Sequence, residues 1–166
     1  MSIVGVLFRF TERGDWVFIV LATVIWGSAL AVTAWDFVVL QGGIYRFGMV
    51  NALGLGLCVA GFSLREVARR TLGRYYTYGL KMLRDHRLVK HGVYRYVRHP
   101  IYFAAFLYNS GFPLLFSSLY GFVLMQGFVP LTLYRIGVEE RILIERFGDE
   151  YREYMKKTKK LIPLIY

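Results

Sequence analysis

Charged side chains are missing from three long stretches of this 166-residue sequence. Asp, Glu, Lys and Arg do not occur in residues 16–35, 47–64 and 101–134, and 56% of all residues are apolar. A water-soluble domain of this length does not carry such runs, so the composition excludes one. We expect a single integral membrane unit over residues 1–166.

Cysteine and histidine are also scarce. Cys58 is the single cysteine, so no intramolecular disulfide can form. The three histidines, His86, His91 and His99, have no neighbouring cysteines and no metal-ligand spacing. Residues 1–15 lack the basic start and the cleavage site of a signal peptide. We therefore expect no metal site and a first apolar run that is retained as a membrane span.

The lengths of the apolar runs predict the number of membrane segments. A helix that crosses about 30 Å of hydrocarbon needs roughly 20 residues, which fits runs 16–35 and 47–64. The third run would form a helix of about 50 Å, too long for one crossing. Gly111, Pro113 and the Ser117-Ser118 pair supply helix breakers and caps in its middle.

We therefore predict two short helices, 101–116 and 119–134, joined near Ser117-Ser118. The expected fold class is an all-α membrane protein with four hydrophobic helical segments, two spans plus a short helical hairpin. Loop 65–100 and tail 135–166 would connect and complete them.

Basic residues are concentrated in two of the polar segments. Loop 65–100 holds ten Lys or Arg against two acids, and tail 135–166 holds eight against six. Basic loops remain in the cytoplasm, so both termini, the loop and the tail are expected there. Lys156, Lys157, Lys159 and Lys160 are best explained by attraction to membrane lipids, and no nucleic-acid partner is expected.

The polar segments also carry helix signals and chemically versatile side chains. Residues 66–72 predict an amphipathic extension of the second span that ends at Gly73. Pro100 suits the first turn of a helix, so His99 lies at a helix N-terminus that favours an anion. Arg95 and Arg98 are interpreted as anchors for lipid phosphates.

The predicted hairpin brings a second charged group to this helix start. Arg135, Glu139 and Glu140 follow the last apolar run, and Arg135 and Glu139 lie on one helix face. Antiparallel hairpin helices place Tyr102 close to Arg135 and Glu139. A surface ion pair would explain these charges simply, but charges at a membrane exit are costly without a partner or a purpose.

Three stretches together resemble a known family. They are ARRTLGRYYT (68–77), LVKHGVYRYVRHPIY (88–102) and EERILIERFGDEYREY (139–154), and they are similar to motifs of the isoprenylcysteine carboxyl methyltransferase and phospholipid methyltransferase group. The resemblance implies S-adenosylmethionine as cofactor, with S-adenosylhomocysteine as product. It also implies a cytoplasmic pocket that the loop and the C-terminal helix roof.

The resemblance assigns roles to individual residues. Arg135 would face the methyl-accepting carboxylate and is the implied catalytic residue. Gly54-Leu55-Gly56 resembles a glycine motif of the phospholipid enzymes, but helix packing explains it better. The implied cofactor-binding residues are His86, Arg87, Leu88, Val89, Tyr94, His99, Pro100, Ile101, Tyr102, Glu139 and Glu140.

The implied function is carboxyl O-methylation of an isoprenylcysteine-like, membrane-embedded substrate. The partners would be a lipophilic small molecule or a prenylated substrate and membrane lipids; the oligomeric state is left open. The alternatives are a phospholipid N-methyltransferase, an NADPH-dependent membrane reductase and a non-catalytic lipid-binding protein. An amine acceptor must lose a proton, and an arginine facing it would not help, which favours a carboxylate.

Overall fold

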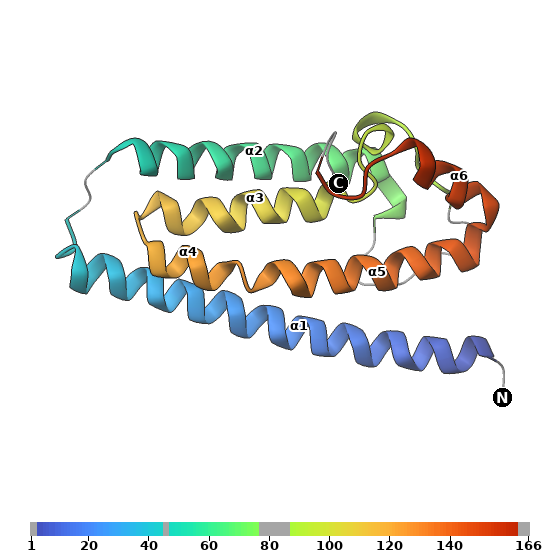
Figure 1. The fold of residues 1–166 in the computed structure, drawn as a ribbon, viewed down its shortest axis with the longest axis horizontal. Helices are drawn as coiled ribbons and strands as arrows, with labels where there is room; N and C mark the ends of the chain where they lie inside the picture. Colours follow the sequence, from blue (N-terminus) through green and yellow to red (C-terminus); the bar gives the residue numbers. More distant parts are fainter. Residues whose placement is uncertain (1–2, 45–46, 77–86, 163–166) are drawn as a thin grey trace.

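A computed structural model describes residues 3–44, 47–76 and 87–162, with side chains from residue 16 onward. Figure 1 shows a bundle of long helices that run back and forth along one axis. The elements are α1 (Ile3–Trp35), the π-helical η1 (Asp36–Leu40), α2 (Met49–Leu72), the 3₁₀ turns η2 (Gly73–Tyr75) and η3 (Gly92–Arg95), α3 (Pro100–Leu115), α4 (Leu119–Met125), α5 (Phe128–Phe147) and α6 (Asp149–Lys157).

Three helical segments are long and apolar enough to cross a membrane. They are Trp16–Leu40, Met49–Tyr75 and Leu119–Phe147. The first two contain most of the predicted spans 16–35 and 47–64. An all-helical architecture with three candidate membrane spans is therefore confirmed for the described residues.

The predicted hairpin turn lies where the serine pair indicated. α3 ends at Leu115 and α4 begins at Leu119, close to the predicted helix 101–116. Ser118 is the N-cap of α4, and its hydroxyl accepts a hydrogen bond from the Gly121 amide at 3.0 Å. Ser117 takes a positive φ of 55° to reverse the chain.

The prediction of one continuous helix over 119–134 is wrong. The helix is broken within this range, and it ends well beyond residue 134. The helix is interrupted after Met125, at Gln126 and Gly127, and then α5 continues through the charged residues to Phe147. Pro130 falls in the first turn of α5, where its missing N–H leaves no intrahelical bond unmade. The charged residues that begin at Arg135 therefore do not end the helix.

The second span also continues into its polar extension, as predicted. α2 runs without a break to Leu72, and Gly73, with a φ of 53°, donates its amide to the Arg69 carbonyl. Glycine accepts this left-handed conformation without a Cβ penalty. The predicted helix over 66–72 and its end at Gly73 are confirmed.

α2 and α3 pack against each other along most of their lengths, side by side and antiparallel in Figure 1. Glycines allow the backbones to touch. An added Cβ at Gly61 would lie 2.8 Å from the Ala104 carbonyl oxygen, and one at Gly111 would lie 2.6 Å from the Gly54 carbonyl oxygen. Such close approach of small residues holds helices together in lipid.

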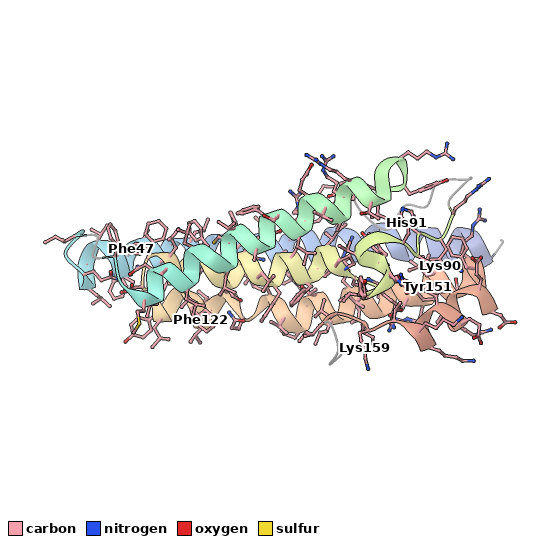
Figure 2. The ribbon with its side chains drawn as sticks, turned by 90° about the horizontal axis from the view of Figure 1, so that it is seen from above. Phe47, Lys90, His91, Phe122, Tyr151 and Lys159 are labelled. Atoms are coloured by element: carbon pink, nitrogen blue, oxygen red, sulfur yellow. The ribbon has the colours of Figure 1, made fainter. Side chains whose placement is uncertain are left out.

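The helices gather the polar chemistry at one end of the bundle. In Figure 1 the beginning of α3, the end of α5 and all of α6 lie at the same end. Figure 2 shows Lys90, His91, Tyr151 and Lys159 at that end, whereas Phe47 and Phe122 lie toward the other. The fold therefore brings the polar loop and the tail together.

The glycine contacts generate a stability prediction. A Cβ on Gly54 would collide with the Leu115 backbone nitrogen, whereas one on Gly56 would meet nothing within 4 Å. We expect Gly54→Ala to lower the free energy of unfolding by about 1 to 3 kcal/mol through overpacking. Gly56→Ala, two residues away in the same helix, is the matched control and should change it by less than about 0.5 kcal/mol. Thermal unfolding in detergent measures both, and equal midpoints would contradict the packing role of Gly54.

Candidate functional site

The C-terminal tail pairs with the segment that precedes α3. Val97 and Lys159 form a parallel bridge, and the Lys159 amide donates to the Tyr96 carbonyl at 3.1 Å. The Arg98 and His99 amides donate to the carbonyls of Lys159 and Lys160 at 2.8 and 3.1 Å. These bonds fix the tail beside the N-terminus of α3.

Arg98 stabilises the same junction with its side chain. Its guanidinium donates to the Glu140 carboxylate at 2.9 Å and to the carbonyls of Met155 and Thr158 at 3.1 and 2.5 Å. Only 7% of the side chain is exposed. The expectation that Arg98 binds lipid phosphates is therefore wrong, because the fold supplies a carboxylate and two carbonyls as its partners.

Glu140 lies at the centre of a cluster of nitrogen-bearing side chains and is itself buried. Its carboxylate lies 2.9 Å from Arg98 Nε, 3.3 Å from His99 Nε2 and 3.5 Å from Lys160 Nζ. Lys160, expected on the membrane surface, is thus turned inward by an anion. Because three donors surround it, Glu140 holds loop, helix and tail in one arrangement.

Glu139, the next residue of α5, has a different environment. It is about one-third exposed, and its carboxylate is 4.0 Å from His99 Nδ1. It also hydrogen-bonds to the Tyr102 hydroxyl. This more open carboxylate can still receive a cationic ligand.

Arg135 lies on the other side of Tyr102. Its Nε donates to the Tyr102 hydroxyl at 3.1 Å, and its guanidinium carbon is 4.2 Å from the centre of the Phe18 ring. The Arg135 side chain is buried. The predicted proximity of Tyr102, Arg135 and Glu139 is confirmed.

The N-terminus of α3 adds backbone donors to this group. Pro100 occupies the first turn, as predicted, and the first intrahelical bond runs from the Phe103 amide to the His99 carbonyl at 3.1 Å. The amides of Ile101 and Tyr102 precede that bond, and first-turn amides of this kind suit an anionic ligand.

Tyr94 and Val89 form part of a small core beneath the site. They pack with Ala68, and Ile101 lies against this cluster. The Tyr94 carbonyl accepts a hydrogen bond from the Tyr154 hydroxyl at 2.6 Å. Burial, and after it the Glu139 carboxylate, raise the pKa of the Tyr94 hydroxyl above its usual value, so it keeps its proton.

The other residues of the predicted cofactor-binding stretch differ in their exposure. Leu88 is half-buried and Arg87 is exposed. His86 lies outside the described residues, so its predicted role is not tested.

Tyr151 is a site neighbour that the sequence reasoning missed. It is 1% exposed, and its hydroxyl has no hydrogen-bond partner within the described part of the chain. Burial, followed by the nearby Glu140 carboxylate, raises the pKa of this hydroxyl. The spacing of Tyr151 and Tyr154 on the otherwise charged α6 was the available signal for a buried face.

A pocket lies between α3, α4 and α5, and Tyr102 is one of its lining residues. The empty space between its lining residues is about 320 Å³ when the adjoining open solvent is counted with it. The lining residues are Tyr102, Phe106, Asn109, Ser110, Met125, Gln126, Phe128, Val129, Thr132 and Leu161.

Comparison with known proteins shows which family this chain resembles. The model of the isoprenylcysteine carboxyl methyltransferase (ICMT) family matches residues 53–145, more than half of the chain. The chain is 35% identical over 128 residues to the protein-S-isoprenylcysteine O-methyltransferase of Schizosaccharomyces pombe, covering 73% of this chain and 52% of that protein. For the Saccharomyces cerevisiae protein of the same name the values are 37% over 124 residues, 70% and 50%.

A solved structure shares the fold. It is described as the eukaryotic intramembrane Ras methyltransferase ICMT without a monobody, and it superposes with a TM-score of 0.62 at 24% identity. The match covers 95% of this chain and 52% of that one, and the chain likewise spans about half the length of the two yeast relatives. The match to the family model over more than half of its residues shows that the chain belongs to the isoprenylcysteine carboxyl methyltransferase family.

Proposed function

We propose that this protein transfers a methyl group from S-adenosylmethionine to the carboxylate of a lipophilic, membrane-embedded acceptor of the isoprenylcysteine type. The observation that carries the proposal is the position of Tyr102. Its hydroxyl contacts Arg135, which suits an acceptor carboxylate, and Glu139, which suits a cofactor ammonium. The yeast relatives named as isoprenylcysteine O-methyltransferases support the same activity.

The chain's residues match the charged groups of the cofactor. S-adenosylmethionine carries an ammonium, a carboxylate, a sulfonium and an adenine ring, and when bound it supplies an activated methyl group. We assign the ammonium to Glu139, because Glu140 is already surrounded by Arg98, His99 and Lys160. The carboxylate suits His99 and the first-turn amides of α3.

The remaining residues implied by the family resemblance complete the proposed cofactor site. Tyrosine rings suit the sulfonium and the adenine, since both interact well with aromatic faces. Glu140 would act indirectly, by holding His99 and Arg98 in place. The residues assigned here besides Glu139, His99 and Glu140 are His86, Arg87, Leu88, Val89, Tyr94, Pro100, Ile101 and Tyr102.

Arg135 would orient the acceptor. A carboxylate is ionised at neutral pH, so its attack on the methyl carbon needs no general base. A guanidinium held against Tyr102 and Phe18 presents its donors to that carboxylate in a fixed direction. The apolar pocket that Tyr102 helps to line would take the lipophilic chain. An amine acceptor gains nothing from an arginine at this position.

The membrane arrangement follows from the same proposal. We infer that the end of the bundle with α6 and the start of α3 faces the cytoplasm, because the basic loops lie there. α3, with 16 residues, would be a fourth, short hydrophobic segment, so residues 1–166 would form one membrane domain.

Ligand binding tests the cofactor class. In detergent or nanodiscs, calorimetry should show binding of S-adenosylhomocysteine and none of NADPH. A labelled methyl donor offered with N-acetyl-S-farnesylcysteine or phosphatidylethanolamine should then label only the carboxylic acid. Binding of NADPH alone would replace the proposal with a reductase, and labelling of the phospholipid would replace the acceptor.

Glu139→Gln tests the cofactor side. Removing the charge that faces the ammonium should weaken S-adenosylhomocysteine binding by about 10- to 100-fold, the range for a lost charge-assisted hydrogen bond. Glu145→Gln, an exposed carboxylate on the same helix, is the matched control. Calorimetry measures both dissociation constants, and unchanged affinity in Glu139→Gln would remove this assignment.

Arg135→Gln tests the acceptor side. The variant should lose at least about 100-fold in kcat/KM for the carboxylic acceptor, because the buried guanidinium aligns the nucleophile. Its S-adenosylhomocysteine affinity should change by less than about threefold. Arg141→Gln, exposed on the same helix, serves as control. A comparable loss of cofactor affinity and of turnover would assign Arg135 to the cofactor site instead.

A further inference from the structure

Three side-chain contacts join the segment that precedes α3 to helix α6, and they keep a constant register. In each contact the two partners are 60 residues apart in the sequence. Both partners advance by four residues from one contact to the next, so residues 90–98 and α6 run in the same direction. On α6 this spacing selects one face of the helix. The pairs are Lys90–Glu150, Tyr94–Tyr154 and Arg98–Thr158.

The three contacts differ in their exposure to solvent. Tyr94 and the Arg98 side chain are each 7% exposed, and both of their contacts are hydrogen bonds to carbonyl groups. Lys90 Nζ lies 2.6 Å from Glu150 Oε1, but these two side chains are 41% and 56% exposed. The segment is therefore held by buried contacts near α3, whereas its Lys90 end is held to α6 by an ion pair that salt can screen.

The exposed contact adjoins the stretch that we assign to the cofactor. Lys90 directly follows residues 87–89 and lies at the polar end of the bundle in Figure 2. Val89 packs against Ala68 of α2, while Lys90 pairs with Glu150 in the first turn of α6. Neighbouring residues thus attach this stretch to two different helices, and its position depends on both of them.

A second exposed ion pair of the same length provides a comparison. Lys156 Nζ lies 2.6 Å from Glu153 Oε1, and both residues belong to α6. A pair three residues apart on one helix stabilises that helix slightly and joins nothing else. Lys90–Glu150 instead joins two separate segments, so its loss would change the position of one relative to the other.

We propose that Lys90 and Glu150 are positioning residues, whose ion pair holds residues 87–89 against α6 and whose opening controls how fast the cofactor and its product exchange. This inference rests on the proposed function, which assigns residues 87–89 to S-adenosylmethionine. His99 is 4% exposed, so a ligand beside it requires part of the covering structure to move. Opening at the Lys90 end would leave the contacts of Arg98 with Glu140 and the tail in place.

Charge reversal tests the pair. Lys90→Glu and Glu150→Lys, each in the full chain in nanodiscs, should speed the dissociation of labelled S-adenosylhomocysteine by about three- to tenfold, because each replaces an attraction with a repulsion. The double variant restores opposite charges and should return the rate to within about twofold of the parent.

Ionic strength and a matched variant provide the controls. Raising sodium chloride from about 50 mM to about 500 mM should speed dissociation from the parent, because salt screens an exposed pair, and should not speed it from Lys90→Glu. Lys156→Glu makes the same change in net charge and breaks the pair within α6. It should alter the dissociation rate by less than about twofold.

The outcomes separate this inference from the proposed function. Parent-like dissociation from both single variants, an equal acceleration in Lys156→Glu, or a double variant that stays fast would each overturn the positioning role and leave the methyltransferase proposal in place. If the parent binds no S-adenosylhomocysteine, the proposed function fails, and this inference fails with it.

Discussion

The buried contact between Arg98 and Glu140 is the interaction on which the site depends. It joins three parts of the chain, because Arg98 precedes α3, Glu140 belongs to α5, and the carbonyls of Met155 and Thr158 come from the end of α6 and the tail. A buried ion pair contributes little net stability over an apolar pair, but the loss of one partner leaves an uncompensated charge at a cost of about 3 to 5 kcal/mol. Other arrangements of loop and tail would separate these charges, so the pair selects one geometry for the helix start and for the carboxylates beside it.

Glu139 and Glu140 are consecutive residues of α5, but their carboxylates have different environments. Consecutive residues of an α-helix point about 100° apart. Glu140 therefore faces Arg98, His99 and Lys160, while Glu139 faces Tyr102 and keeps about one-third of its surface open. The sequence alone does not distinguish the two glutamates. The packing of α5 does. This difference is why the cofactor ammonium is assigned to one and the organisation of the site to the other.

Local signals in the sequence predicted the helices but not the partners of the charged residues. Pro100, Gly73 and the Ser117-Ser118 pair each act through their own backbone geometry, and the structure confirms the boundaries that they indicated. The helix over 119–134 was wrong because a charge-free run reports the polarity of the surroundings and not the end of helical hydrogen bonding. Arg98 was misread for a related reason: its acceptors lie 42 to 60 residues away, and only the folded tail brings them together.

Tyr102 lies between the polar end of the bundle and the apolar pocket. In the proposed reaction a water-soluble, charged cofactor approaches from the polar end of the bundle, and a lipophilic acceptor approaches from the pocket between α3, α4 and α5. The hydroxyl of Tyr102 contacts Arg135 and Glu139, while the same residue forms part of the pocket wall. Phe18 covers Arg135, and a charge that is shielded from water interacts more strongly with its ligand. Alignment at this boundary, with water excluded on the membrane side, is then sufficient for a nucleophile that is already ionised.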